Sequence, residues 1–396
     1  MVQGLNSWRT IEMSEWKECK LGAVVKSNAS SIGKNYSYDI INYLDTGSIT
    51  QGKIENFQKV ELVDAPSRAK RLVKNNDIVY STVRPIQRHY GFIVNPPENF
   101  VVSTGFSVIE TNRDLAYPLF IYYFLTTDEI VETLDVIADG STSAYPSLRP
   151  LDIENLDISL PPLPEQKAIV SVLSSLDDKI DLLHRQNKTL EAMAETLFRQ
   201  WFIEEARENW EEGKIPNEFD FIMGVSPLGE SYNEEGYGIP MYQGNADFEF
   251  RFPKRRVYTI EPKRFAEKFD TLISVRAPVG AQNMASEKCC IGRGLATFRY
   301  KRDNSYYTYT YFKMKSLMKE IKQFNETGTV FGSISKGDFE AFEIVIPPDI
   351  LVDKFQAIVK PIDDKVIKNS YQIETLEKLR DILLPKLMSG EVRVKM

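Results

Sequence analysis

The chain repeats itself, and this internal duplication limits what it can fold into more than any other feature of the sequence. Leu160-Pro161-Pro162 recurs as Ile346-Pro347-Pro348, a shift of 186 residues. The same shift carries Asp177-Asp178-Lys179-Ile180 onto Asp363-Asp364-Lys365-Val366 with no gap between the two matches. Self-similarity at one fixed offset indicates copies of a single structural unit. We therefore expect two modules of about 190 residues each.

The first part of each module is more divergent than the last. It is rich in glycine, asparagine, proline, aromatic residues and short alternating apolar runs, which is typical of a compact mixed or β-rich domain. Weaker matches still join the two first parts: Tyr38–Tyr43 with Tyr237–Tyr242, Asp77–Arg84 with Asp270–Arg276, and Ser103–Phe106 with Gly292–Leu295. This pattern is expected if the first parts recognise different targets and the last parts share one structural role.

The last part of each module predicts a long helix. Apolar residues recur at alternating spacings of four and three from Ile169 to Trp201, and again from Phe355 to Leu387. A seven-residue period of this kind is typical of a coiled-coil seam. We expect Gly213 to end the first helix, so that residues 204–212 are helical.

Proline positions predict irregularities in the second helix. Its Pro-Pro pair is followed by Asp349-Ile350-Leu351 instead of Leu-Pro-Glu-Gln, so we expect a less regular start. Pro361 should kink or restart the helix and Pro385 should end or bend it, because proline lacks the N–H and clashes with the preceding turn.

Each seam contains one asparagine, Asn187 and Asn369. If the helices pair antiparallel about a pseudo-twofold axis, residue numbers in contact add to a constant. A constant of 556 places the two asparagines opposite each other. We hypothesise that they face each other and fix the register, as a polar seam residue can. The alternative is that each faces solvent.

Together these patterns predict an α+β protein with two pseudo-twofold-related recognition domains of mixed or β-rich structure, separated by two long antiparallel coiled-coil helices. The expected boundaries are 1–160 for the first domain, 161–212 for the central helix, 213–346 for the second domain and 347–396 for the C-terminal helix.

Composition limits the class of function. Three cysteines and two histidines give no disulfide framework and no zinc-ligand spacing, so we expect no metal and a reducing cytoplasm. No apolar run is long enough for a membrane span, and we expect no secretory signal, because Met1–Gly4 is not a basic region followed by an apolar stretch. The net charge of −7 argues weakly against a free-standing DNA binder, although local basic faces remain compatible with it.

Two short motifs superficially match catalytic ones, and we interpret both as structural. Asn95-Pro96-Pro97-Glu98 lacks the aromatic residue with which an adenine methyltransferase loop holds its base. Pro348-Asp349 followed by Asp363-Asp364-Lys365 loosely matches a nuclease motif, but its second element falls on a predicted helix. No phosphate-binding loop of the Walker type is present. We expect a non-enzymatic chain that binds no cofactor of its own.

Over essentially its full length the chain resembles the specificity subunits of type I restriction-modification systems. The resemblance is carried by the duplicated architecture, by Leu160–Ile169 (LPPLPEQKAI) and by the closing Leu379–Glu391 (LRDILLPKLMSGE). It implies two target-recognition domains that each read one half of a bipartite DNA site. It also implies two methylase subunits, which use S-adenosylmethionine to modify one adenine per half-site, and nuclease-translocase subunits, which use ATP.

Candidate base-reading residues follow from side-chain chemistry, since Arg and Gln can make paired hydrogen bonds to guanine and adenine in the major groove. In the first domain the candidates are Tyr36, Arg84, Gln87, Arg88, His89 and Ser143. In the second domain they are Gln243, Asn245, Arg276, Gln282, Asn283 and Arg293. For two basic clusters we expect phosphate contacts: Arg68, Lys70, Arg71 and Lys74, and Lys254, Arg255, Arg256, Lys263 and Arg264.

Two other functions remain open on sequence grounds. The chain could serve a system that methylates DNA and has no nuclease partner. It could also be a helical interaction scaffold whose globular parts do not touch DNA. Loss of DNA binding by the assembled complex would favour the scaffold, whereas neighbouring genes would separate the two kinds of DNA-modifying system.

Overall fold

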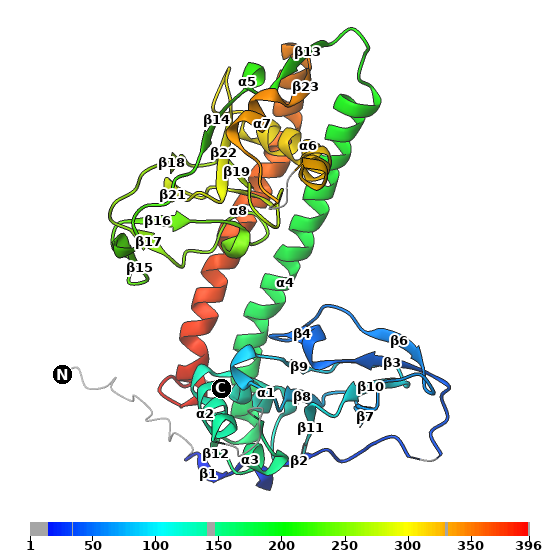
Figure 1. Ribbon diagram of the computed structural model, residues 1–396. Helices are drawn as coiled ribbons and strands as arrows, with labels where there is room; N and C mark the ends of the chain where they lie inside the picture. Colours follow the sequence, from blue (N-terminus) through cyan, green and yellow to red (C-terminus); the bar gives the residue numbers. More distant parts are fainter. Residues whose placement is uncertain (1–14, 34, 141–146, 329–331, 395–396) are drawn as a thin grey trace, which may run out of the picture. The chain divides into compact units, whose positions relative to one another are not determined.

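The computed structural model describes residues 15–33, 35–140, 147–328 and 332–394. The chain divides into two compact units. Unit 1 comprises residues 1–179 with 376–396, and unit 2 comprises residues 180–375. Two long helices, α4 (Leu163–Arg199) and α8 (Asp349–Met388), contribute residues to both units (Figure 1).

Unit 1 is built on two four-stranded sheets with the strand orders β6-β3-β10-β7 and β2-β11-β8-β9. Two-stranded pairs, β1 with β12 and β4 with β5, complete its β structure. Its strands are β1 (Lys17–Lys20), β2 (Val25–Ser27), β3 (Ile40–Leu44), β4 (Ile49–Thr50), β5 (Lys53–Ile54), β6 (Gln58–Glu61), β7 (Ala69–Leu72), β8 (Ile78–Ser81), β9 (Tyr90–Phe92), β10 (Phe100–Ser103), β11 (Phe106–Thr111) and β12 (Asp157–Leu160).

The helices of unit 1 pack the second of these sheets against the long helices. They are α1 (Pro118–Thr126), α2 (Asp128–Asp139) and α3 (Pro150–Glu154), with 3-10 turns η1 (Leu21–Ala23), η2 (Thr46–Ser48) and η3 (Pro85–Gln87). The main core joins Ile78 of β8 and Phe120 of α1 to Leu173 of α4 and Leu387 of α8. Strand β8 is buried along its whole length, and its first two residues, Ile78 and Val79, are fully buried in the core.

Unit 2 repeats the arrangement of unit 1. Its sheets have the orders β14-β22-β19-β20 and β15-β17-β16-β21-β18, with β13 paired to β23. Its strands are β13 (Glu211–Lys214), β14 (Phe219–Met223), β15 (Tyr232–Asn233), β16 (Ile239–Tyr242), β17 (Tyr258–Thr259), β18 (Phe265–Ala266), β19 (Thr271–Ser274), β20 (Gln282–Met284), β21 (Cys289–Ile291), β22 (Leu295–Tyr300) and β23 (Glu343–Ile346). In each unit one parallel pair, β3 with β10 or β16 with β21, sits among antiparallel strands.

The remaining elements of unit 2 enclose an aromatic core. They are η4, a π-helical turn (Gln200–Glu204), α5 (Ile215–Glu218), η5 (Gly229–Ser231), η6 (Asn245–Asp247), α6 (Tyr307–Gly328) and α7 (Lys336–Ala341). Phe198 of α4, Tyr309 of α6 and Phe355 of α8 meet in this core. The long helices are therefore part of the core of this unit.

The predicted end of the central helix is wrong. Residues 204–212 were expected to be helical, but α4 ends at Arg199, the π turn ends at Glu204, and Glu211–Lys214 forms β13. Gly213 does not stop a helix. It lies opposite Ile344 in the β13–β23 pair, and a Cβ on it would come within 2.6 Å of Ile346 Cδ1.

Two of the irregularities predicted for the C-terminal helix, the less regular start and a restart at Pro361, are also wrong. Helix α8 begins at Asp349, the position that the 186-residue shift makes equivalent to the start of α4 at Leu163, and it ends at Met388, short of the predicted residue 396. It continues through Pro361 without restarting. An interior proline costs a helix about 3 kcal/mol. Here Phe355 and Val359 are fully buried on the same helix, and their packing offsets that cost.

Within unit 2 the two long helices run antiparallel. Asn369 Nδ2 donates a hydrogen bond to Asn187 Oδ1 at 2.9 Å, and the rings of Trp201 and Phe355 lie 6.3 Å apart. The residue numbers in both contacts add to 556. The predicted contact between the two asparagines is therefore present, while its role in fixing the register stays a prediction. None of the helices in the described part of the chain is long and apolar enough to cross a membrane.

Candidate nucleic-acid interface

Three loops of unit 2 lie side by side and are joined by backbone hydrogen bonds. We call this place the loop junction. The three loops are the chain after β16 at Gln243, the end of β19 at Val275 and Arg276, and the turn Gly292–Gly294 between β21 and β22. The Gly292 N–H donates to the carbonyl of Tyr242 at 2.8 Å, and the Val275 N–H donates to the carbonyl of Gly294 at 2.9 Å. These backbone bonds hold the three loops in one fixed arrangement.

Close backbone packing makes the turn of this junction dependent on glycine. A Cβ on Gly294 would lie 2.1 Å from the carbonyl oxygen of Gln243, and one on Gly292 would lie 3.1 Å from the Gln243 Cα. A glycine is needed wherever two backbones approach this closely. Arg293 is therefore the one residue of the turn that carries a side chain, and it is exposed.

The exposed side chains of the unit 2 junction suit base recognition. Gln243, Arg276 and Arg293 are exposed, while Asn245 at the start of η6 is half-buried. The side chains of Arg276 and Arg293 form no ion pair with any residue in the described ranges. Arginine can bind guanine O6 and N7 with two hydrogen bonds, and glutamine can bind adenine in the same way.

The same junction exists in unit 1. The Thr82 N–H donates to the carbonyl of Gly105 at 2.8 Å, as Val275 does to Gly294. The Leu148 N–H donates to Thr82, and Val83 forms a β-bridge with Ser147. In unit 2 the Ile334 N–H donates to Val275 and Arg276 bridges Ser333. The duplication therefore extends to the hydrogen bonds of these loops.

This equivalence corrects the pairing of Arg84 with Arg276. The backbone places Val83 at the position of Arg276, and Arg84 is the next residue, exposed and in the left-handed region at φ 47°. At the position of Arg293, unit 1 has the exposed Thr104. Sequence reasoning missed Thr104 as a candidate, although the match of Ser103–Phe106 with Gly292–Leu295 already aligned it with Arg293.

Two further candidates of the first domain, Arg88 and His89, are partly occupied by contacts within unit 1. Arg88 Nη2 lies 2.7 Å from Asp128 Oδ1 of α2. His89 Nδ1 lies 2.6 Å from the carbonyl oxygen of Ile49; because a carbonyl only accepts, this nitrogen carries the proton. Gln87 is exposed at the end of η3. Arg88 and His89 thus hold the η3 loop in place, and Gln87 stays a candidate together with Arg84.

Tyr36 packs against the small core of Ile41, Tyr43, Ala69 and Val101. Its hydroxyl is buried and has no hydrogen-bond partner among the described residues, and burial raises the pKa of that hydroxyl. These surroundings argue against a base contact. Ser143 lies outside the described residues.

Two candidates of the second domain are structural, which corrects the prediction that they read bases. Asn283 is fully buried and its Nδ2 donates to the Glu249 carbonyl at 2.7 Å. Gln282 Nε2 donates to the Tyr311 carbonyl at 2.7 Å, and its Oε1 is also buried. Both amides connect β20 to neighbouring segments inside unit 2 and are not available at its surface.

Some cations of the two basic clusters form ion pairs within the protein, and others form none in the part of the chain that the structure describes. Lys74 pairs with Glu110, Arg255 with Glu287 and Glu374, and Arg256 with Asp247. The exposed cations of these clusters that have no ion pair among the described residues are Arg68, Lys70, Lys254, Lys263 and Arg264. These five suit phosphate contacts. No group of three or more metal-ligating side chains occurs in the described ranges.

Comparisons with known proteins agree with this organisation. The family model of the type I restriction modification DNA specificity domain matches residues 13–192 and 207–378. The putative type I restriction enzyme MjaX specificity subunit of Methanocaldococcus jannaschii is 30% identical, over 98% of this chain and 94% of its own length. The type I restriction enzyme HindI specificity subunit of Haemophilus influenzae is 25% identical, over 96% of this chain and 100% of its own.

A solved structure shows the same fold. The crystal structure of the type I restriction-modification system S subunit from M. genitalium superimposes with a TM-score of 0.59 at 18% identity, over 98% of both chains. The two matches of the family model cover most of the sequence, one in each copy of the internal repeat. The chain therefore belongs to the family of type I restriction modification DNA specificity domains.

Proposed function

We propose that this chain is the DNA-specificity subunit of a type I restriction-modification system and that its two modules read the two halves of a bipartite, asymmetric site. One observation carries this proposal. The loop junction recurs in both units with two matching backbone hydrogen bonds and a matching β-bridge, but it presents Gln243, Arg276 and Arg293 in one unit and Val83, Arg84 and Thr104 in the other. One scaffold with two sets of side chains reads two different half-sites.

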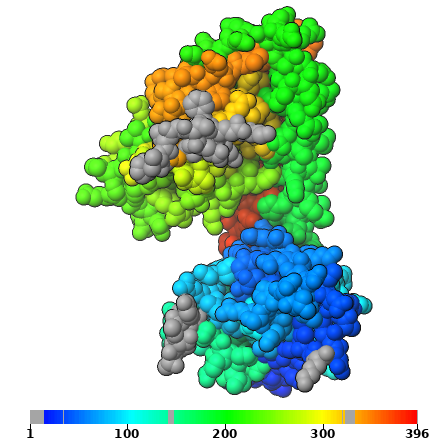
Figure 2. All heavy atoms as spheres, turned by 45° about the vertical axis from the view of Figure 1, so that its right-hand side comes forward, coloured from blue at the N-terminus to red at the C-terminus, as the bar shows by residue number. Residues whose placement is uncertain are grey.

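The chemistry belongs to partner subunits. Two methylase subunits would dock on the long helices and the recognition modules, with S-adenosylmethionine as their methyl donor. Nuclease-translocase subunits would join for ATP-dependent cleavage. Along unit 2, α4 keeps one side at the surface, with Met193 among its exposed apolar residues (Figure 2). This side is available to a partner, and the chain itself is non-catalytic.

The long helices would also set the distance between the two half-sites. A helix advances 1.5 Å per residue and keeps its direction, whereas a flexible linker of the same length samples many end-to-end distances. Two readers attached to one rigid helix pair therefore define a fixed number of unread base pairs. The localisation that follows from this function is the cytoplasm, where DNA and the partner subunits meet.

The test is methylation in a host that has no methylation of its own. The chain is expressed with its neighbouring methylase gene, and modified adenines are mapped by single-molecule sequencing. A bipartite motif with a fixed gap, absent when this chain is omitted, is the expected result. A contiguous motif would contradict the two-module reading. A stable complex that methylates nothing and binds no DNA would favour the interaction scaffold.

A further inference from the structure

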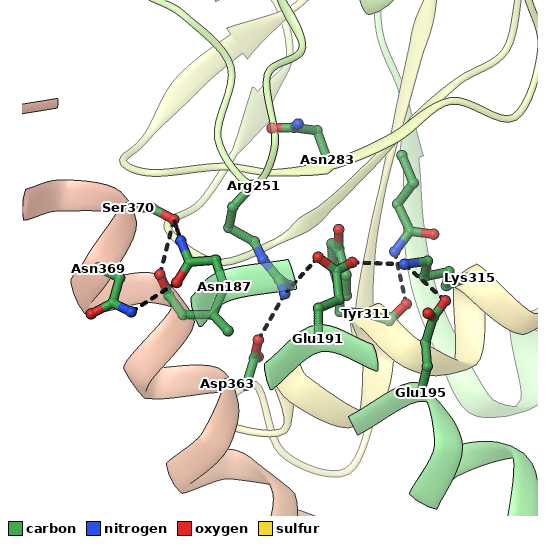
Figure 3. A network of polar contacts seen from close by, with 12 residues as sticks. Asn187, Glu191, Glu195, Arg251, Asn283, Tyr311, Lys315, Asp363, Asn369 and Ser370 are labelled. Atoms are coloured by element: carbon green, nitrogen blue, oxygen red, sulfur yellow. Dashed lines mark hydrogen bonds and ion pairs between the residues drawn. The ribbon is translucent and has the colours of Figure 1, made fainter. Parts of the chain in front are cut away.

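A buried arginine joins the second recognition module to both long helices. Arg251 is the largest fully buried side chain of the described residues. Its Nη2 lies 3.1 Å from Asp363 Oδ1 on α8 and 4.0 Å from Glu191 Oε2 on α4 (Figure 3). Its guanidinium carbon lies 3.9 Å from the ring centre of Tyr311 on α6. A charge this deeply buried is tolerated only with such partners.

The loop that carries Arg251 begins at the loop junction. Four residues after Gln243, η6 ends at Asp247, and the Lys254 N–H donates back to the Asp247 carbonyl at 2.7 Å, which closes the loop 247–254. The Asn283 amide donates to Glu249, and the Met284 N–H donates to the Arg251 carbonyl at 3.0 Å. The first loop of the junction and Arg251 thus belong to one short segment, and two hydrogen bonds from β20 hold this segment in place.

We call the contacts of Arg251 with Asp363, Glu191 and Tyr311 the anchor. Further ion pairs beside it join α4 to α6. Lys315 Nζ of α6 lies 2.6 Å from Glu191 Oε1 and 2.8 Å from Glu195 Oε1, both on α4 (Figure 3). The Gln282 amide donates to the carbonyl of Tyr311, the residue on which Arg251 stacks. The Arg251 side chain forms no hydrogen bond among the described residues, so its ion pair with Asp363 and its stacking on Tyr311 are the contacts that place the loop on the helices.

The described residues of unit 1 contain no counterpart of this anchor. Asp177 is the equivalent of Asp363, and it accepts a hydrogen bond from the Tyr123 hydroxyl at 2.6 Å and pairs with Arg380 of α8 at 3.1 Å. The 186-residue shift that relates the helices places Ala194 at the position of Arg380. In unit 2 the helix therefore supplies no cation at this place, and the recognition module supplies Arg251 instead.

From these contacts we infer that Arg251 is a positioning residue that holds the reading loops of the second module in their orientation on the helix pair. Its removal lowers the fidelity with which the second half-site is read and leaves the first half-site unchanged. The inference rests on the proposed function and adds to it the residue on which one half of the specificity depends.

The test uses a variant that removes the anchor and keeps the fold. Arg251→Met with Asp363→Asn replaces the charge pair by side chains of similar volume, and the asparagine can still accept the hydrogen bond that the Thr308 hydroxyl gives to Asp363. Glu191 keeps its partner Lys315. Arg299→Met is the matched control, because Arg299 pairs with the buried carboxylate of Asp270 inside the sheet and forms no ion pair or hydrogen bond with either long helix in the described part of the chain.

Two readouts are measured on the full chain with its methylase. In the double variant, methylation at sites with one mismatch in the second half-site is expected to rise about tenfold relative to the wild type, the equivalent of one lost base contact. Sites mismatched in the first half-site should not change. Amide hydrogen exchange should increase in residues 243–254 and 292–294 but not in β19 or β22. The Arg299→Met control should leave the motif unchanged.

Different results would separate the two ideas. An unchanged motif together with unchanged exchange of residues 243–254 would overturn the inference and leave Arg251 a contributor to stability alone. Equal loss of fidelity in both half-sites would also overturn it, because the anchor is found in unit 2 and not in the part of unit 1 that the structure describes. A wild-type chain that directs no bipartite methylation would refute the proposed function. Hydrogen exchange of the same loops would then still show whether Arg251 holds them.

Discussion

Arg293 stands at the tip of a turn that the surrounding backbone holds rigid. Gly294 packs against Gln243 so closely that it has no room for a side chain, and Gly292 is tightly packed against the same residue. Most other arginines of unit 2 are ion-paired within the protein, including Arg251, Arg299 and Arg302. An exposed guanidinium on a rigid turn loses little backbone entropy when it binds. Of the candidates in this module, Arg293 therefore has the strongest case for direct base contact.

Replacing this arginine should relax one base position of the second half-site. Arg293→Ala removes a side chain that can make two hydrogen bonds to one guanine, and the expected loss is about 1–3 kcal/mol of discrimination at that position. Mapping of methylated adenines measures it directly. Arg293→Lys keeps the charge but loses the planar pair of donors. It should recover overall affinity without recovering the base preference.

Arg84→Ala is the corresponding experiment in the first module. The left-handed backbone at Arg84 suits glycine better than alanine, so Arg84→Gly accompanies it as a conformational control. Both variants should relax a base in the first half-site and leave the second unchanged. A change in the second half-site would contradict the assignment of one module to each half.

Side-chain chemistry alone could not separate base readers from structural residues. Gln282, Asn283 and Arg293 are all polar residues in short β-type runs, and all three are plausible contacts by composition. Asn283 faces inward and bonds to Glu249, a residue 34 positions earlier, while Arg293 is held outward by glycine packing against Gln243. Both outcomes depend on contacts between distant segments, which a local pattern does not contain.

The two long helices were predicted more successfully than the recognition modules, because a seam of constant period is a local property of the sequence. Asn187 and Asn369 are both fully buried and hydrogen-bonded to each other, as the antiparallel pairing required. The end of α4 was predicted wrongly because β13 competes for residues 211–214. That strand exists only through its pairing with β23, more than 120 residues later.

The asparagine pair allows a direct test of its energetic role. Asn187→Leu leaves the amide of Asn369 buried without its acceptor and should destabilise the protein by about 1–3 kcal/mol. The double replacement by leucine should recover most of this loss, because both polar groups are then gone. Denaturant unfolding of the two single variants and the double variant gives the coupling energy. Additive single effects would show that the two side chains do not act as a pair.

Lys313 of α6 gives a prediction for the dependence of stability on pH. Its amino group is buried and donates to the Val345 carbonyl at 2.7 Å, and burial lowers its pKa from the ordinary value of 10.5. Below its folded-state pKa the charge is present in both states and its burial costs stability. Between that pKa and 10.5 only the unfolded state keeps the proton, so stability should rise with pH.

Lys313→Met should therefore be more stable than the wild type at pH 7, by about 1 kcal/mol after loss of the hydrogen bond to Val345. The advantage should shrink as the pH rises toward 10.5. Thermal unfolding of both proteins between pH 7 and pH 10.5 measures the difference. A constant difference across this range would show that Lys313 keeps its ordinary pKa in the folded protein.

At the scale of the whole molecule, the acidic net charge indicates that base contacts and phosphate contacts are made by different subunits. The chain carries a net charge of −7, and many of its cations are paired within the protein. Phosphate contacts dominate the affinity of most DNA-binding proteins and need unpaired lysine and arginine. A chain with this acidic balance can select a sequence through a small number of base contacts. Most of the contacts with the DNA phosphates must then come from partner subunits.

This division of labour predicts how salt affects binding. The logarithm of the binding constant falls with the logarithm of salt concentration by about 0.9 for each neutralised phosphate. The chain alone should bind a duplex containing its site weakly and with a shallow slope, and the complex with methylase subunits should bind with a slope steeper by several units. Titrations between 50 and 200 mM salt on the matched site and on a scrambled duplex measure both. Equal slopes for the chain and the complex would mean that the partners add no phosphate contacts, and the acidic charge of this chain would then need another explanation.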